Sequence, residues 1–161
     1  MAFLKSVMIS SRSFLHFHLG AFIFYSSLGR LNEKLHDYGV SCLRRAADSG
    51  HIQASYLLGV RLKYRGTNSA YQTSGIEYLR KAASNGASQN QFMLAEALKE
   101  TLLDCEVKSE ILFLYESAAK QGYKMAELRL SEAHEQGLFG LTINQKKAEY
   151  WSHKFLADSD L

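Results

Sequence analysis

Apolar residues recur along the chain at the spacing of one face of an α-helix. One stripe follows the i, i+3, i+6, i+7 pattern and consists of Ile76, Leu79, Ala82 and Ala83. A second stripe precedes it and consists of Ala54, Leu57, Leu58 and Leu62. No strand is evident, and the chain contains no proline that would interrupt a helix. The pattern predicts an all-α protein built from amphipathic helices.

The helical pattern repeats with a period of 36 residues. The sequence Ala-Ala-Asp-Ser-Gly at 46–50 recurs as Ala-Ala-Ser-Asn-Gly at 82–86 and as Ala-Ala-Lys-Gln-Gly at 118–122. Large apolar residues keep the same register, as at Leu58, Leu94 and Leu130. A helix often ends in the left-handed conformation, which glycine adopts without a steric penalty. We therefore expect a structural role, as helix ends, for Gly50, Gly86 and Gly122.

The A-A-x-x-G block, followed in residues 54–59 by A-x-x-x-L-G, resembles the Sel1-like repeat (SLR), a relative of the tetratricopeptide repeat. The resemblance is strongest over 40–66 and continues over 74–86 and 111–130. It implies an all-α, right-handed α/α solenoid of about four Sel1-like helix pairs. We expect a single repeat domain over residues 1–161, with repeats at approximately 13–50, 51–86, 87–122 and 123–158.

Three positions depart from this repeat pattern. Gly59 is replaced by Ala95 and then by Ser131, and Ala54 is replaced by Asn90, so the middle repeat is the least typical and its packing between helices is harder to predict. Lys154 stands where the earlier repeats have the first alanine of A-A-x-x-G. We expect a lysine to be tolerated there because nothing needs to stack beyond it.

The apolar stretch at residues 14–25 has three possible interpretations. It could be the apolar part of a secretory signal or a membrane anchor over residues 1–28. However, no A-x-A cleavage site follows it, and it is too short to span a bilayer. Its Leu19-Gly20 resembles Leu58-Gly59, so we expect the first helix of the repeat array and a cytoplasmic protein. A secreted or periplasmic location would follow if residues 1–28 were a signal.

Charge is distributed unevenly along the chain. The formal net charge is +3, but residues 1–100 carry twelve Lys/Arg against six Asp/Glu, and residues 101–161 carry seven against ten. This asymmetry reflects either solvated helix faces or a basic end that steers an acidic partner. One basic run, Arg61, Lys63 and Arg65, is interleaved with Leu62 and Tyr64. A single short run is weak support for nucleic-acid binding, so we expect neither nucleic acid nor membrane as a partner.

The sequence contains none of the common catalytic motifs. There is no phosphate-binding loop, no H-E-x-x-H and no G-x-S-x-G. Cys42 and Cys105 lie 63 residues apart, which is not a multiple of the repeat, and no spacing suits a zinc site. His16 and His18 would point in different directions on a helix and could not chelate one ion. We expect no catalytic residue, no metal and no cofactor.

Two alternatives to a binding protein remain open. Some bacterial secreted proteins with Sel1-like repeats are described as β-lactam hydrolases, and these carry a regular cysteine pair in each repeat that this chain lacks. The second alternative is a membrane-tethered adaptor with an N-terminal anchor.

In proteins of this family the first helix of each pair generally lines the concave face, so the resemblance implies that a partner binds there. By repeat position these residues are Tyr56, Val60, Lys63, Phe92, Glu96, Lys99, Leu128, Glu132 and Glu135. For Tyr56 and Phe92 the alternative is packing between repeats. We expect a monomeric, non-enzymatic module that binds another protein, as an adaptor, an assembly factor or a protein that neutralises a toxin or effector.

Overall fold

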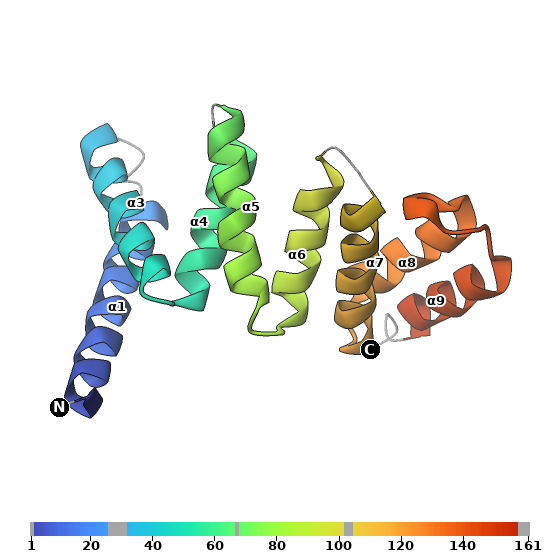
Figure 1. Ribbon diagram of the computed structural model, residues 1–161, viewed down its shortest axis with the longest axis horizontal. Helices are drawn as coiled ribbons and strands as arrows, with labels where there is room; N and C mark the ends of the chain where they lie inside the picture. Colours follow the sequence, from blue (N-terminus) through green and yellow to red (C-terminus); the bar gives the residue numbers. More distant parts are fainter. Residues whose placement is uncertain (1, 26–31, 67, 102–104, 158–161) are drawn as a thin grey trace. The chain divides into compact units, whose positions relative to one another are not determined.

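The computed structural model describes residues 2–25, 32–66, 68–101 and 105–157 of the chain (Figure 1). Within these ranges it is all-α, as predicted, with eight α-helices, one short 3₁₀ helix and no strand. The helices are α1 (Ala2–Tyr25), α3 (Glu33–Asp48), α4 (Ile52–Arg65), α5 (Ser69–Ala83), α6 (Ser88–Lys99), α7 (Cys105–Lys120), α8 (Lys124–Gln136) and α9 (Gln145–Ala157), with η1 at Leu138–Gly140. The stretch at 14–25 is therefore helical. None of the described helices is long and apolar enough to cross a membrane.

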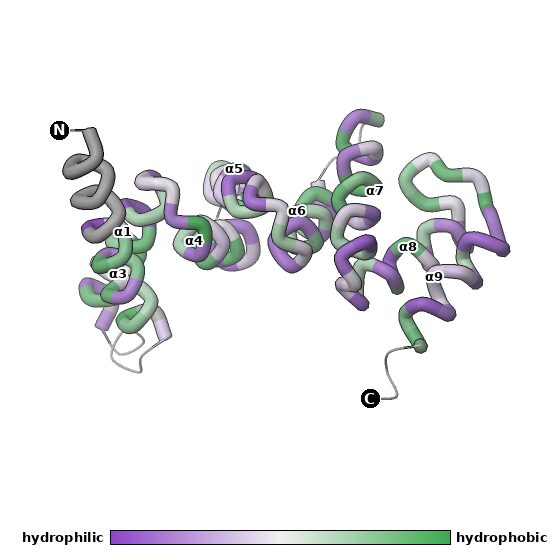
Figure 2. Tube along the Cα trace, turned by 90° about the horizontal axis from the view of Figure 1, so that it is seen from below, coloured by the Kyte–Doolittle hydropathy of each residue, from purple (hydrophilic) through white to green (hydrophobic). Residues whose placement is uncertain are grey.

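The chain divides into two compact units. The N-terminal unit, Met1–Asn85, contains the helix pairs α1/α3 and α4/α5. The C-terminal unit, Gly86–Leu161, contains the pairs α6/α7 and α8/α9. Hydrophobic positions are interleaved with hydrophilic positions along the helices of both units, as amphipathic packing requires (Figure 2). Each unit therefore contains two helix pairs.

The A-A-x-x-G block acts as a helix terminator whose alanines supply backbone acceptors. At the end of α3 the N–H of Gly50 donates to the carbonyl of Ala47 (3.0 Å), and the N–H of His51 donates to the carbonyl of Ala46 (3.0 Å). These two bonds form a Schellman motif, and the same pair of bonds closes α7 at Gly122. All three glycines have positive φ: +87° for Gly50, +79° for Gly86 and +80° for Gly122.

Glycines allow the two helices of a pair to approach closely in the N-terminal unit. A Cβ on Gly59 of α4 would lie 2.8 Å from Cγ of Leu79 and 3.0 Å from the carbonyl oxygen of Gly75 on α5. Helices α1 and α3 meet in the same way, because a Cβ on Gly20 would lie 2.9 Å from the carbonyl oxygen of Gly39. Contacts this short cannot accommodate any side chain. The core around them is formed by residues that include Leu43, Ala46, Ala47, Ala54, Leu58 and Leu62.

The C-terminal unit closes its last helix pair with polar side chains. Ser131, at the position of Gly59, donates its hydroxyl to the carbonyl of Ala148 on α9 (2.9 Å). Lys154 has a role that the repeat pattern did not predict. Its Nζ lies 3.3 Å from Oε1 of Glu127, a carboxylate with no exposed surface, and Lys124 pairs with the other oxygen at 3.2 Å. Lys154 therefore compensates a buried charge within its own unit.

Candidate functional site

The residues expected to bind a partner differ in exposure: some are exposed, some are half-buried and some are buried. Tyr56 and Val60 of α4 are half-buried and line one groove. Lys63, one turn further on, is only 6% exposed, because it lies on the side of α4 that faces α5. In the C-terminal unit Phe92 is 7% exposed, whereas Leu128 is half-buried and Glu135 is exposed. The candidate site of the N-terminal unit is therefore the groove lined by Tyr56 and Val60.

The groove has a volume of about 500 Å³ and is lined by three helices. One face of α4 contributes most of the lining, since residues four apart on a helix lie above one another. Helix α1 adds Tyr25 from its last turn, and α3 adds His36. The lining residues are Tyr25, His36, Tyr56, Leu57, Val60, Arg61, Tyr64 and Arg65. It therefore combines three tyrosines and two aliphatic side chains with cationic groups at one end of α4.

A contact between Arg61 and His36 fixes the cationic side of the groove. Nη2 of Arg61 lies 2.8 Å from Nε2 of His36. Because a guanidinium can only donate, Nε2 of His36 is the acceptor in this bond. Burial lowers the pKa of Arg61, and the positive charge of Arg65, one helical turn away, lowers it further. None of the described residues that line the groove is Asp or Glu.

Phe92 packs in the core of the C-terminal unit, although it is equivalent by repeat position to Tyr56 in the groove. Its ring centroid lies 5.0 Å from that of Tyr123, the N-cap residue of α8. The N-terminal unit has a similar arrangement two helix pairs earlier, where Phe17 stacks on His51, the N-cap residue of α4, with ring centroids 4.2 Å apart. Phe92 therefore has a packing role.

A sequence signal for this difference lies at the N-cap position. The residues there are His51, Ala87 and Tyr123, and Ala87 has no ring. In these two contacts the aromatic residue precedes the ring on which it packs by 34 or 31 positions. Tyr56 lines the groove and is followed by alanine at position 87.

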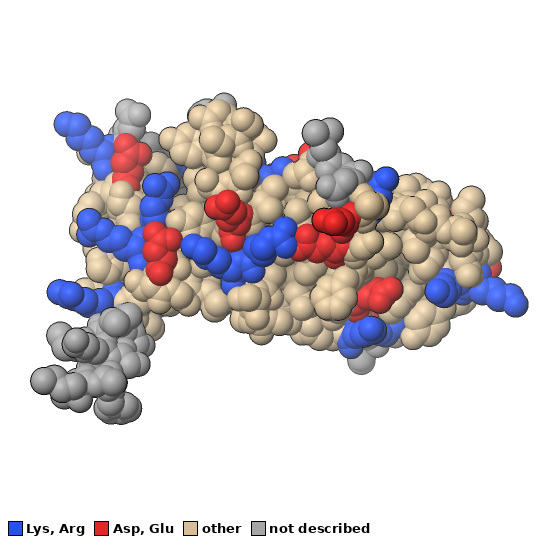
Figure 3. All heavy atoms as spheres, in the orientation of Figure 1, with Lys and Arg blue, Asp and Glu red and all other residues tan. Residues whose placement is uncertain are grey.

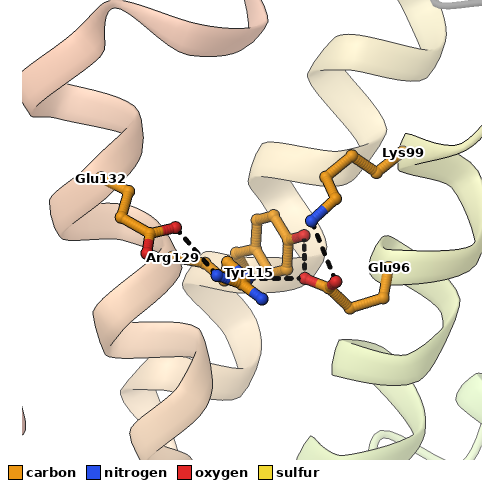
Figure 4. Close-up of polar contacts among 5 residues, drawn as sticks. All are labelled: Glu96, Lys99, Tyr115, Arg129 and Glu132. Carbon is orange, nitrogen blue, oxygen red and sulfur yellow. Dashed lines mark hydrogen bonds and ion pairs between the residues drawn. The ribbon is translucent and has the colours of Figure 1, made fainter.

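Three of the predicted residues of the C-terminal unit belong to an internal polar network (Figure 4). The carboxylate of Glu96 on α6 accepts hydrogen bonds from the hydroxyl of Tyr115 on α7 (2.6 Å), from Nε of Arg129 on α8 (2.9 Å) and from Nζ of Lys99 (3.0 Å). Nη1 of Arg129 also donates to Glu132 at 2.9 Å. The network joins three helices, so these charges stabilise the unit.

Ionisation in this network is strongly shifted. Burial opposes the charged form of Glu96, but the hydrogen bonds donated by Tyr115, Lys99 and Arg129 outweigh it and hold the pKa of Glu96 below its ordinary value. Burial and the adjacent Glu96 carboxylate raise the pKa of Tyr115 far above that of a free tyrosine. Ion pairing with Glu132 and Glu96 overcomes the effect of burial and raises the pKa of Arg129. At neutral pH Glu96 and Arg129 are therefore charged, and the Tyr115 hydroxyl keeps its proton.

Among the described residues no three His, Cys, Asp or Glu side chains are grouped so as to hold a metal ion. Cys42 is buried and Cys105 is exposed, and both are free thiols. The groove residues that sequence reasoning did not place in a binding site are Tyr25, His36, Leu57, Arg61, Tyr64 and Arg65. Only the α4 members carried a signal, since Tyr64 lies eight residues after Tyr56 on the same helical face.

Comparison with known proteins identifies the repeat. A family model described as plant tetratrico peptide repeats matches residues 28–92. A solved Sel1 repeat protein from Oxalobacter formigenes is 23% identical over 74% of this chain and 90% of its own, with a TM-score of 0.63. A protective antigen of uropathogenic Escherichia coli strains that displays an SLR fold is 26% identical and has a TM-score of 0.74. That match covers 97% of this chain and 32% of the antigen, so this chain spans about a third of the antigen's length. No curated protein matches the sequence.

Proposed function

Because the chain is a Sel1-like repeat protein, we propose that it acts without catalysis, by binding a segment of another protein in the groove of its N-terminal unit. Helical repeat folds of this kind are typical of protein–protein interaction modules. Whether the protein is an adaptor, an assembly factor or an inhibitor of a toxin or effector follows from the identity of that partner.

The observation that carries this proposal is the composition of the groove. Binding sites are concave, mostly apolar and supplied with a few polar groups that fix orientation. The groove has a volume of about 500 Å³, within the roughly 300–1,000 Å³ usual for such sites, and its walls are tyrosine and aliphatic side chains. Tyrosine and arginine are the residues on which binding energy most often concentrates at protein interfaces. Tyr56 and Val60, expected from repeat position, both lie in this lining.

The partner can be identified by crosslinking from the groove. A photoreactive phenylalanine analogue at Tyr64, which is exposed and lines the groove, should capture the partner in lysate of the native source. The same analogue at Tyr38, which is exposed on α3 and does not line the groove, is the matched control. We expect a product that forms from position 64 and not from position 38.

The affinity of the captured partner then tests the role of the groove. Tyr56→Ala should weaken binding by about 1–3 kcal/mol, or about 5- to 150-fold, as expected when an interface aromatic is truncated. Tyr38→Ala should bind like the wild type. Circular dichroism must show that both variants are folded. A partner that binds folded Tyr56→Ala as tightly as the wild type would exclude the groove as its site.

A further inference from the structure

We infer that the outer face of α1 binds a second copy of this chain, with the two α1 helices packed antiparallel about a two-fold axis at His18. The outer face carries Phe14, Leu15, His18, Ala21 and Phe22. The inference goes beyond the proposed function and does not rest on it, because none of these five residues lines the groove. It replaces the monomer expected from the sequence with a dimer.

Helix α1 has one side packed in the N-terminal unit and the opposite side exposed. Gly20 is buried against α3. On the opposite side Phe14 is 59% exposed, and Leu15 and Phe22 are each 66% exposed. Residues 13–25 contain no Lys, Arg, Asp or Glu, whereas charged side chains of both signs stand on the face shown in Figure 3. A contiguous apolar patch of this kind commonly marks an interaction site.

The order of side chains on the outer face identifies the partner as a second copy. Phenylalanine lies four positions before His18, at Phe14, and four positions after it, at Phe22. The positions three before and three after hold a large and a small residue, Leu15 and Ala21. All five share one side of the helix. An antiparallel pair centred on His18 therefore places Phe14 of one copy against Phe22 of the other, and Leu15 against Ala21. The face is thus complementary to itself, as a two-fold dimer requires.

Ring contacts within the N-terminal unit hold the centre of the outer face in place. The ring centroid of Phe14 lies 4.0 Å from that of His18, in an edge-on arrangement. The His18 ring lies 5.1 Å from that of Phe17, which in turn stacks on His51 at the start of α4. Side chains that are ordered before association lose less entropy when they bind.

The exposed apolar area of α1 sets the expected strength of the dimer. Phe14, Phe22 and Tyr25 are 59%, 66% and 64% exposed. Because an aromatic side chain buries about 150–250 Å², these three rings offer about 300–450 Å² per copy. Two copies would together bury about 600–900 Å² before Leu15 is counted, which lies at the low end for specific interfaces. We therefore expect a reversible dimer with a dissociation constant in the micromolar range.

Sedimentation velocity of the full-length chain between about 1 and 200 µM tests the inference. We expect the wild type to change from monomer to a species of twice its mass as the concentration rises. Phe22→Glu would bury a carboxylate against an apolar ring and should weaken association at least about 10-fold. Phe113→Glu is the matched control, because Phe113 is also 66% exposed but lies on α7, and it should associate like the wild type. Circular dichroism must show that both variants are folded.

Mixing two variants tests the antiparallel register. Phe14→Glu and Phe22→Lys should each be monomeric alone. Mixed together they should form a one-to-one dimer, because the antiparallel pair brings the new carboxylate beside the new ammonium group and keeps the other phenylalanine contact. Phe14→Glu mixed with Phe14→Lys is the control. The antiparallel pair holds these two positions about 12 Å apart along the helix axes, so this mixture should stay monomeric.

Four results would overturn the inference. The first is a wild type that stays monomeric at the highest concentration, and the second is a dimer that both Phe22→Glu and Phe14→Glu leave intact. The third is recovery of the dimer in the control mixture instead of the antiparallel one. The fourth is a monomeric chain that binds phosphatidylcholine vesicles and loses this binding in Phe22→Glu, which would assign the outer face to a membrane surface. None of these results bears on the groove, whose test depends on Tyr56.

Discussion

Replacing Lys154 with alanine separates the repeat pattern from the structure, because the two predict opposite results. Ala46, Ala82 and Ala118 occupy the equivalent positions, so the pattern alone predicts that Lys154→Ala is neutral or stabilising. In the structure, however, Lys154 lies 3.3 Å from the fully buried carboxylate of Glu127 and donates a hydrogen bond to the carbonyl of Ala119 at 3.2 Å. We therefore expect the variant to be less stable.

The size of the loss follows from the surroundings of Glu127. Removing one partner of a buried ion pair typically costs about 3–5 kcal/mol, because the remaining charge is left buried. Two features reduce that cost. The Lys154 side chain is 36% exposed, and Lys124, at 3.2 Å, still neutralises the carboxylate. We expect Lys154→Ala to lower the free energy of unfolding by about 1–3 kcal/mol.

Urea denaturation followed by circular dichroism measures this loss, and fluorescence of Trp151, the single tryptophan, reports on α9. Lys146→Ala, at an exposed position in the first turn of α9, is the matched control and should change stability by less than about 0.5 kcal/mol. A double-mutant cycle with Glu127→Gln isolates the ion pair, since Lys154→Ala should cost much less when the carboxylate charge is gone. A Lys154→Ala protein as stable as the wild type, or an equal loss in the Glu127→Gln background, would refute this reasoning.

Two further predictions concern helix ends. Gly86→Val should cost about 1 kcal/mol or more, because φ of Gly86 is +79° and a β-branched residue resists it, whereas Gly86→Asn should lower the melting temperature far less. A Cβ at position 86 would have no neighbour within 4 Å, so a steric clash would not explain a loss of stability. If Gly86→Val and Gly86→Asn lowered the melting temperature equally, the positive φ would not be the cause of the loss. His51 accepts the N–H of Ala54 at the start of α4, and burial together with the charge of His18 lowers its pKa. Because the pKa of His51 is lower in the folded than in the unfolded chain, its contribution to stability is complete above about pH 6.5 and is lost as the pH falls. The variant His51→Asn keeps a side-chain acceptor at the N-cap but does not titrate in this range. We therefore expect its urea midpoint to change less between pH 7 and pH 5 than that of the wild type. A His51→Asn profile as steep as that of the wild type would count against this role.

The helices, their repeat and the family could be predicted from the sequence because each is encoded locally. The A-A-x-x-G block, for example, contains both the carbonyl acceptors and the glycine that a Schellman motif requires. The candidate site could be predicted only in part. Tyr56 and Val60 followed from repeat position, but Tyr25 and His36 reach the groove from other helices, and no spacing along the chain encodes that meeting.

Repeat position also does not determine burial. Tyr56 and Phe92 are equivalent in sequence, yet Tyr56 lines the groove, whereas Phe92 packs on Tyr123, which lies 31 positions later in the chain. The same holds for Lys154, whose role depends on Glu127 of the preceding helix. Long-range partners of this kind are specific to one repeat and are invisible in the pattern that all repeats share.

The close contact of Gly59 with Gly75 limits where the gene of a repeat protein can recombine and still encode a chain that folds. The residues that meet inside a helix pair are matched: glycine with glycine in α4/α5, and Ser131 with the backbone of Ala148 in α8/α9. A crossover inside a pair would place a helix that carries Ala95 or Ser131 at the position of Gly59 against a helix such as α5. The added Cβ would clash with backbone atoms of that helix, and no change of rotamer could relieve the clash. Duplication or exchange of repeats should therefore preserve folding when the junction falls at an A-A-x-x-G turn between two helix pairs, as at Gly50 or Gly122, where backbone hydrogen bonds close the preceding helix.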